Sequence, residues 1–391
     1  MLNRLPWRNA TTGRMLLLCA FTMICLGLVM VFSAVASLDE STDWYKRRDM
    51  RQAVFAGIAA IALFLLWRID YRKLAGTGPF PRWMFALFLL SVVVGALVLV
   101  PGIRHEAGGK FRWIKIGPKS FGFRIQPSEI IKVVMVLFLA CWLTRPGVKI
   151  RSWKTFGLGV LVLCLAEAFV IKADLGTGIL IAMVWGMTLL LAGVPWHRFL
   201  ALIPPAAAAG SYLMFSDPYR LNRFKAWLNP WGDDTISSYH TRQSLLSVFS
   251  GDWFGMGPGN GVRKLGFLPE DSTDFLFASY CEEWGFVGAV LLIGLWLMLL
   301  RQCQKAASRA EDSLGRVLAV ALGGMLILQA ILHIAVNLVL LPPTGVALPL
   351  MSAGGTGLVL SACCVAVIGS VAFRPGHWDD DELTTPTLHV H

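Results

Sequence analysis

Ten long apolar stretches recur along the chain, and this recurrence constrains the fold more than any other feature of the sequence. They span approximately residues 14–36, 52–67, 83–101, 128–144, 154–171, 175–192, 196–215, 274–300, 317–341 and 356–373. Crossing the hydrocarbon core of a bilayer takes roughly 20 apolar residues in a helix. The 391 residues are 56% hydrophobic and 15% charged, which is too apolar a composition for a soluble globule. We therefore predict an all-α integral membrane protein with about ten transmembrane helices.

The first apolar stretch could belong either to a cleaved signal peptide or to a transmembrane span. A basic lead-in precedes it (Arg4, Arg8 and Arg14), and small residues end it at positions 33–36. The apolar run is longer than the h-region of a signal peptide, so we predict an uncleaved first span.

Short basic loops orient the predicted spans. Lys and Arg cluster after spans two, four and eight, for example at Arg72, Lys149 and Arg301, and such loops stay cytoplasmic. The sequence therefore predicts a cytoplasmic N-terminal tail (1–13), a polytopic membrane domain (14–374) and a cytoplasmic acidic C-terminal tail (375–391). Residues 102–127, and a larger loop between spans seven and eight, are then extracytoplasmic.

The first extracytoplasmic loop carries basic residues, against the rule that places them inside. It contains six Arg and Lys residues and a single acidic residue, Glu106. Four more basic residues follow span one. Arginine grips phosphate in a bidentate manner, so this loop could bind an anionic ligand. Attraction to anionic lipid headgroups explains the charge equally well.

Several functional classes are excluded by missing motifs. No Walker, dinucleotide-binding or HExxH pattern occurs, so we expect no nucleotide-driven reaction, and no nucleic acid partner. The eight cysteines lie almost wholly in apolar stretches, without the spacing of a zinc site or a disulfide framework. We predict that they serve as small core residues.

Charged residues at the ends of the spans are the candidates for chemistry, because an ionisable group in the membrane needs a cavity or a partner. Glu129 and Lys132 share a helix face, where a local ion pair is the alternative to a functional role. Asp174 follows a turn and can cap the next helix, which accounts for it as well as function does.

The richest stretch precedes span eight. Glycines at 255, 257, 259 and 261 lead through several carboxylates to Asp274, at the predicted outer boundary. A flexible loop there would place Asp274 at the head of the helix as a general base, although a plain helix-terminal carboxylate is the alternative. Glu282 and Glu283 lie deeper, and at least one should face a cavity or a cation. The irregular segment at Pro342–Gly357 should line a cavity or pack on protein.

These residues carry a resemblance to the SEDS family, the membrane glycosyltransferases of the FtsW, RodA and SpoVE type. The resemblance covers nearly the whole chain, and six motifs occur in order. They are Phe111–Ile114; Gln126–Glu129 with Lys132; Asp174–Thr177; Leu268–Glu270 with Thr273–Phe275; Glu282–Gly285; and Pro343–Gly345 with Leu348–Pro349 and Ser352–Gly355.

The resemblance implies a peptidoglycan glycosyltransferase that polymerises lipid II into β-1,4-linked glycan strands, during cell division or elongation. It assigns catalysis to Asp274, and substrate contacts to Arg112, Gln126, Lys132, Ser352, Lys264, Glu270 and either Arg51 or Arg48. It also implies a divalent cation (Mg²⁺ or Mn²⁺), with Asp174 and Asp274 as possible ligands. The expected location is the bacterial inner membrane.

Partners also follow from the resemblance. A class B penicillin-binding protein, and other membrane proteins of the division or elongation complexes, are expected beside lipid II. Two departures from the family pattern are His333, where asparagine is common, and Ala353, where an aromatic residue is common. The alternatives to the enzyme are a lipid II flippase, which would need a midplane site, and a scaffold without chemistry.

Overall fold

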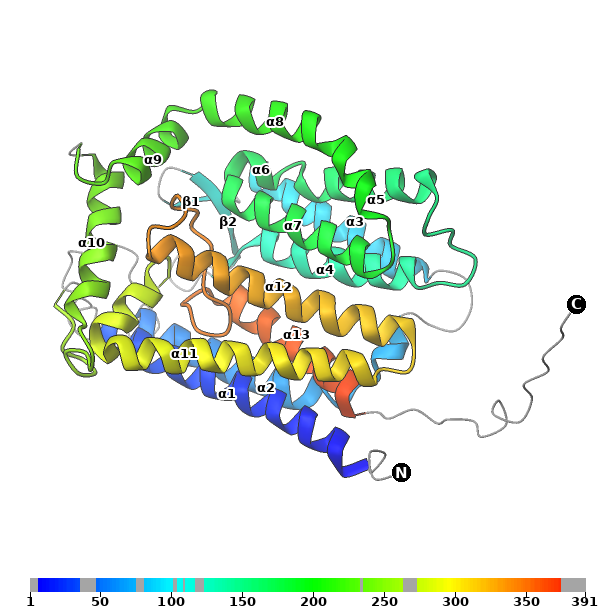
Figure 1. Cartoon of the computed structure of the whole chain (residues 1–391), viewed down its shortest axis with the longest axis horizontal. Helices are drawn as coiled ribbons and strands as arrows, with labels where there is room; N and C mark the ends of the chain where they lie inside the picture. Colours follow the sequence, from blue (N-terminus) through cyan, green and yellow to red (C-terminus); the bar gives the residue numbers. More distant parts are fainter. Residues whose placement is uncertain are drawn as a thin grey trace, which may run out of the picture.

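The computed structural model describes residues 6–35, 47–74, 81–100, 104–107, 110–116, 123–232, 235–262 and 273–373. Most of these residues are helical (Figure 1). The helices are α1 (Pro6–Val35), α2 (Arg48–Leu66), α3 (Arg82–Ala96), α4 (Pro127–Leu143), α5 (Trp153–Glu167), α6 (Val170–Ala173), α7 (Leu175–Leu191), α8 (Ile203–Phe215), α9 (Pro218–Leu228), α10 (Ile236–Ser250), α11 (Leu276–Arg309), α12 (Ser313–Asn337) and α13 (Thr356–Phe373). Three short 3₁₀ helices are η1 (Tyr71–Leu74), η2 (Leu97–Leu99) and η3 (Trp196–Leu202).

Each of the ten predicted apolar stretches overlaps helical residues, although 154–171 is divided between α5 and α6 and 196–215 between η3 and α8. Among the described residues, six helical segments are long and apolar enough to cross a membrane: Thr11–Ala34, Arg48–Leu66, Trp196–Phe215, Leu276–Arg309, Ser313–Asn337 and Thr356–Phe373. The apolar helices α3 and α7 are shorter. The chain is therefore a multi-pass membrane protein. Helix α1 starts at Pro6, inside the stretch predicted as a tail, whereas the predicted tail 375–391 lies outside the described residues.

The centre of the bundle is a continuous apolar core. Helix α13 packs on α1, α2 and α12, and α12 packs in turn on α11, α7 and α4. Figure 1 shows these helices side by side, with α9 and α10 gathered at one end of the bundle. Burial of a long apolar face on neighbouring helices, rather than helix propensity, supplies most of the stability of such an arrangement.

Helix α8 is the exception, because none of its residues is buried. It packs mainly against η3 and α9, and Figure 1 shows it at the edge of the molecule, apart from the central helices. Its apolar side chains, such as Tyr212 and Phe215, are more than 70% exposed in the protein alone. A surface of this kind suits lipid or a partner rather than water.

Three features of the fold were not predicted from the apolar stretches. Strands β1 (Arg104–Ala107), β2 (Lys110–Ile116) and β3 (Phe123–Ile125) form an antiparallel sheet in the order β1-β2-β3, where a loop was predicted. Helices α9 and α10 lie in the large loop. Helix α11 is interrupted at Gly285, whose φ and ψ are 65° and −167°. Hydropathy reports membrane spans, so it revealed none of the three.

Candidate functional site

Two charged side chains meet beside Gly345, in the irregular segment between α12 and α13. A Cβ atom on Gly345 would lie 2.9 Å from Nη1 of Arg112 and 3.3 Å from Oδ2 of Asp274. Gly345 has a φ of +71°, in the left-handed region that glycine adopts without a steric penalty. The glycine therefore leaves room for an arginine from β2 and an aspartate from the turn before α11.

Asp174 joins this cluster through Arg112. Nη1 of Arg112 lies 3.1 Å from Oδ2 of Asp174, and the two side chains are 16% and 6% exposed. Asp174 also caps α7, because its Oδ1 accepts hydrogen bonds from the backbone amides of Gly176 (3.1 Å) and Thr177 (3.3 Å). The sequence analysis left open whether Asp174 is a helix cap or a functional residue. In the structure, Asp174 both caps α7 and pairs with Arg112.

The Arg112 guanidinium retains one donor for a ligand. Its Nε is buried and has no acceptor among the described residues. Buried donors in proteins nearly always have a partner, so an orphaned one indicates a ligand atom or an ordered water. Arg112 thus pairs with Asp174 through Nη1, while its buried Nε has no acceptor in the described part of the chain.

Asn337 fixes the backbone that carries Asp274. From the last turn of α12, its Nδ2 donates to the carbonyl of Asp274 (3.0 Å), and its Oδ1 accepts from the backbone amide of Ala278 (2.9 Å). The Asn337 side chain is fully buried. The sequence analysis missed Asn337, although an amide within an apolar span could have marked it as a polar contact between helices.

Ser352 holds the same turn from the other side. Its hydroxyl donates to the carbonyl of Thr273 (3.1 Å) and accepts from the backbone amide of Leu348 (2.8 Å). Ser352 is 3% exposed, and its side chain points at protein rather than at open space. Its predicted role was a substrate contact, whereas this geometry favours a role in positioning Asp274.

Lys132 lies in a buried polar network. Its Nζ is 2.9 Å from Oε2 of Glu129 and also donates to Oε1 of Gln329, whose Nε2 donates to the carbonyl of Ala347 (2.8 Å). The local ion pair expected from the spacing is therefore present. Lys132 is 1% exposed, so the network ties α4 and α12 to the segment that carries Gly345. Gln329 was not singled out from the sequence.

His333 holds the same segment. Its Nδ1 lies 2.8 Å from the carbonyl of Val346, and the ring is buried. His333 thus makes a polar contact to the residue after Gly345.

The other predicted substrate contacts lie near the same end of the bundle or outside the described residues. Arg51, near the start of α2, is half-buried. Gln126 is the N-cap residue of α4. Lys264 and Glu270 belong to 263–272, outside the described residues.

Glu282 and Glu283 accept hydrogen bonds from the backbone of the glycine-rich segment. Oε1 of Glu282 accepts from the backbone amide of Val262 (3.0 Å), and Oε2 of Glu283 accepts from that of Gly259 (3.1 Å). Ser33 of α1 donates to the other oxygen of Glu283. Both carboxylates thus fasten the glycine-rich segment 251–262 to α11.

The glycine-rich segment is correspondingly not the flexible loop that its composition suggested. Its backbone pairs with α11 at the break: Met256 donates to the carbonyl of Glu282 (2.9 Å), and Phe286 donates to that of Asp252 (2.8 Å). Gly255 and Gly285 both have a positive φ and approach each other closely. The glycines therefore serve close packing in the part of the loop that the structure describes.

A divalent cation at Asp174 does not fit this arrangement. Its oxygens already face two amides, a hydroxyl and the guanidinium of Arg112, which takes the place of a metal ion electrostatically. Across the described residues, no group of three His, Cys, Asp or Glu side chains could hold a metal ion.

Sequence comparisons match the chain along its length. A family model described as "Cell cycle protein" (FtsW, RodA and SpoVE) matches residues 13–375. A probable peptidoglycan glycosyltransferase FtsW from Geobacter sp. (strain M18) is 34% identical over 362 residues, covering 92% of this chain and 96% of that protein. Stage V sporulation protein E from Bacillus subtilis (strain 168) is 34% identical over 374 residues, covering 93% of this chain and 98% of that protein.

Solved structures share the fold. A chain from a peptidoglycan synthase complex that coordinates polymerization and crosslinking is 25% identical, with a TM-score of 0.72, and the match covers 91% of this chain and 96% of that one. A mutant of the rod shape determining protein RodA from Thermus thermophilus is also 25% identical, with a TM-score of 0.64 and the same coverage. With sequence and fold matched over nearly the whole length, this chain belongs to the FtsW, RodA and SpoVE family.

Proposed function

We propose that this protein is a peptidoglycan glycosyltransferase that polymerises lipid II into glycan strands and releases undecaprenyl pyrophosphate. The observation that carries the proposal is the meeting of Asp274 and Arg112 beside Gly345, with Asp174 fixing the arginine. A carboxylate that can accept a proton and a guanidinium that can bind a phosphate are the two groups that this transfer requires.

In the proposed reaction, Asp274 takes the proton from the 4-hydroxyl of the acceptor GlcNAc. The hydroxyl oxygen attacks the anomeric carbon of the donor MurNAc with inversion, a β-1,4 bond forms, and the bond to the lipid pyrophosphate breaks. Arg112 stabilises the negative charge that gathers on the departing pyrophosphate. One carboxylate suffices, because pyrophosphate leaves without protonation, unlike the alcohol released in glycoside hydrolysis.

The remaining polar residues place these two groups. Asn337 and Ser352 hold the turn at Asp274, and Lys132 supports the segment around Gly345 through Gln329. Direct substrate contacts by Arg51, Gln126, Lys264 and Glu270 are part of the proposal. A requirement for Mg²⁺ or Mn²⁺ is a separate prediction, which polymerisation after chelation with EDTA would test.

The proposed setting is the bacterial plasma membrane, with ten spans and both termini in the cytoplasm. The site end of the bundle, with α9 and α10 from the loop between spans seven and eight, then faces outward, where lipid-linked disaccharide is polymerised. The proposed partner is a class B penicillin-binding protein. The relationship to a chain of a peptidoglycan synthase complex supports such a partner.

Glycan synthesis from purified lipid II tests the proposal. The protein, with its cognate partner, would be compared with Asp274→Ala and Asp274→Asn, matched for folding in detergent. We expect polymer from the wild type and a loss of about a thousandfold or more in both variants, as for removal of a catalytic base. Polymer from both variants would move the chemistry to the carboxylates of 263–272. No polymer from a correctly folded, partner-bound wild type would favour the flippase.

A further inference from the structure

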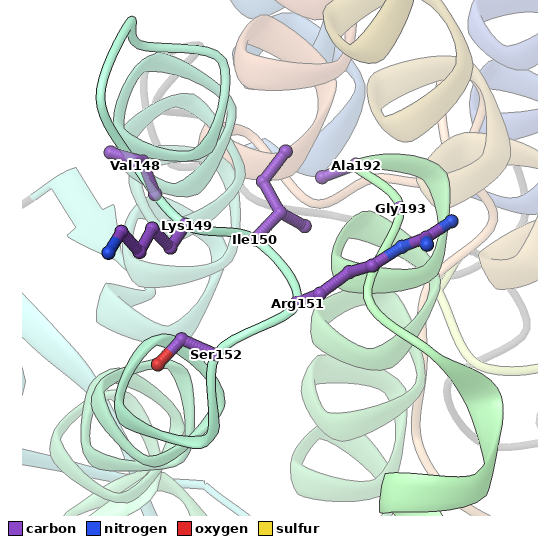
Figure 2. Close-up of a pocket in the computed structure, with 7 residues that line it drawn as sticks. All are labelled: Val148, Lys149, Ile150, Arg151, Ser152, Ala192 and Gly193. Atoms are coloured by element: carbon purple, nitrogen blue, oxygen red, sulfur yellow. The ribbon is translucent and has the colours of Figure 1, made fainter.

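A basic depression lies at the opposite end of the bundle from Asp274. It is an open cavity of about 670 Å³ between the loop that joins α4 to α5 and the loop that follows α7 (Figure 2). The residues around it include Lys149, Ile150, Arg151, Ser152, Ala192 and Gly193. Its volume lies within the range of small-molecule sites in proteins, roughly 300–1,000 Å³.

Three positive charges surround the depression without a carboxylate to balance them. Figure 2 shows Arg151 extending toward Gly193, and Lys149 leaving the same loop on another side. Arg198 lies behind the wall, where its Nη1 donates to the carbonyl of Ser152 (2.9 Å) and its Nη2 to that of Arg151. In the described part of the chain, none of the three cations forms an ion pair with Asp or Glu.

The wall of the depression is built rigidly. Arg198 is 6% exposed, satisfies two loop carbonyls, and lies 5.0 Å from the ring centre of Trp153. Ser152 caps α5 by accepting a hydrogen bond from the backbone amide of Lys154 (3.2 Å). An arginine buried without a counterion is costly unless something anionic lies close by.

Two tryptophans give the depth of the depression in the membrane. Trp153 begins α5 and is 61% exposed, and Trp196 begins η3 and is 69% exposed. Tryptophan concentrates where lipid headgroups meet the hydrocarbon. The cavity therefore opens at headgroup level, on the side that the basic loops place in the cytoplasm.

We propose that this depression binds the phosphate headgroup of an anionic phospholipid of the inner leaflet. Arg151 contacts the phosphate, Arg198 adds its charge from behind, Lys149 adds a second positive charge from the other side of the loop, and the exposed tryptophans flank the acyl chains. The proposal depends on the orientation of the chain in the membrane, but not on its glycosyltransferase activity.

Native mass spectrometry of the detergent-purified full chain, titrated with phosphatidylglycerol or with zwitterionic phosphatidylcholine, tests this site. The double variant Lys149→Gln and Arg151→Gln removes two cations. Each is worth about one kcal/mol near a lipid surface, so phosphatidylglycerol binding should weaken roughly thirtyfold. A second variant, Ala192→Phe, fills the cavity without changing the charge and should weaken binding as well.

The matched control, Arg301→Gln with Lys305→Gln, removes the same charge from the cytoplasmic end of α11 and should leave phosphatidylglycerol binding unchanged. If the control variant weakened phosphatidylglycerol binding equally, the effect would come from general surface charge, and the proposed site would be wrong. Equal binding of phosphatidylcholine would also overturn it. Displacement of the lipid by inorganic phosphate at equal concentration would show that the site takes a free phosphate instead.

Discussion

At the scale of single residues, the site depends on contacts that a side-chain inventory does not show. Asp274 and Arg112 are the reactive groups, yet Gly345 determines whether they can approach each other, and it does so by having no side chain. Asp174 contributes by holding Arg112, at 3.1 Å. A buried ion pair loses much of its value when one partner is removed, because the other charge is left without compensation.

Gly345→Ala should lower polymerisation about a hundredfold, the scale on which misplaced catalytic groups lose rate. The new methyl group would lie 2.9 Å from Nη1 of Arg112, and the guanidinium would move to relieve the contact. Gly354→Ala is the matched control, since its Cβ would meet only Ala347 at 4.0 Å. Equal activity of the two variants in the lipid II assay would contradict this role for Gly345.

Asp174→Asn and Asp174→Ala separate the two contacts of this residue. Asparagine caps a helix about as well as aspartate does but carries no charge to hold Arg112. We expect it to lower the polymerisation rate at least about tenfold and also to lower the thermal stability, because the buried guanidinium loses its counterion. Alanine should lose about 1 kcal/mol of stability beyond the asparagine variant, because the cap is gone as well. Thermal unfolding in detergent and initial rates check the pair, and full activity of the asparagine variant would refute the role of the charge.

At the scale of elements, the break in α11 creates a short helical segment that carries Asp274 at its head. The segment 251–262 is joined to α11 by backbone hydrogen bonds on both sides of Gly285 and by hydrogen bonds to Glu282 and Glu283. We call this set of contacts the clasp. Removing the clasp should therefore loosen the element that presents the catalytic residue.

Gly255→Ala should lower the midpoint of thermal unfolding more than Gly259→Ala does. Both glycines have a positive φ, so alanine costs similar backbone strain at either position, roughly 1–2 kcal/mol. Only at Gly255 would the new methyl group also meet backbone, at 2.1 Å from the carbonyl oxygen of Glu283, whereas nothing lies within 4 Å at Gly259. Indistinguishable midpoints would show that the clasp is not a packed interface.

The helices could be predicted from the sequence, and the clasp could not. Apolar length alone locates α2, α7 and α13 within a few residues, because a bilayer selects for length and hydropathy. The motifs brought Arg112, Asp174 and Asp274 to attention as separate residues. Their meeting depends on the path of irregular backbone at Gly345, and the partners Asn337 and Gln329 are defined by helix packing, which hydropathy does not contain.

At the scale of the whole molecule, the two ends of the bundle carry different groups. The site end, with α9 and α10, lies opposite the basic depression at the ends of α4 and α7 (Figure 1). This polarity leads to the proposed topology, in which substrate is used outside and anionic lipid is bound inside.

Thiol labelling in intact cells tests that orientation. In a background with the eight cysteines replaced by alanine, Ser216→Cys at the start of the large loop should react with a membrane-impermeant maleimide, because the proposed topology places this loop outside. Gln304→Cys, exposed near the other end of α11, should react only after the membrane is permeabilised. Labelling of Gln304→Cys in intact cells would invert the topology.

The order of the site residues along the chain also bears on how the protein is synthesised. Arg112 and Asp174 leave the ribosome first, Asp274 follows, and Gly345 emerges after all three. A nascent chain therefore has no competent site until the segment at Gly345 has been made. A product truncated before Gly345 would contain every charged group of the reaction without being able to bring them together.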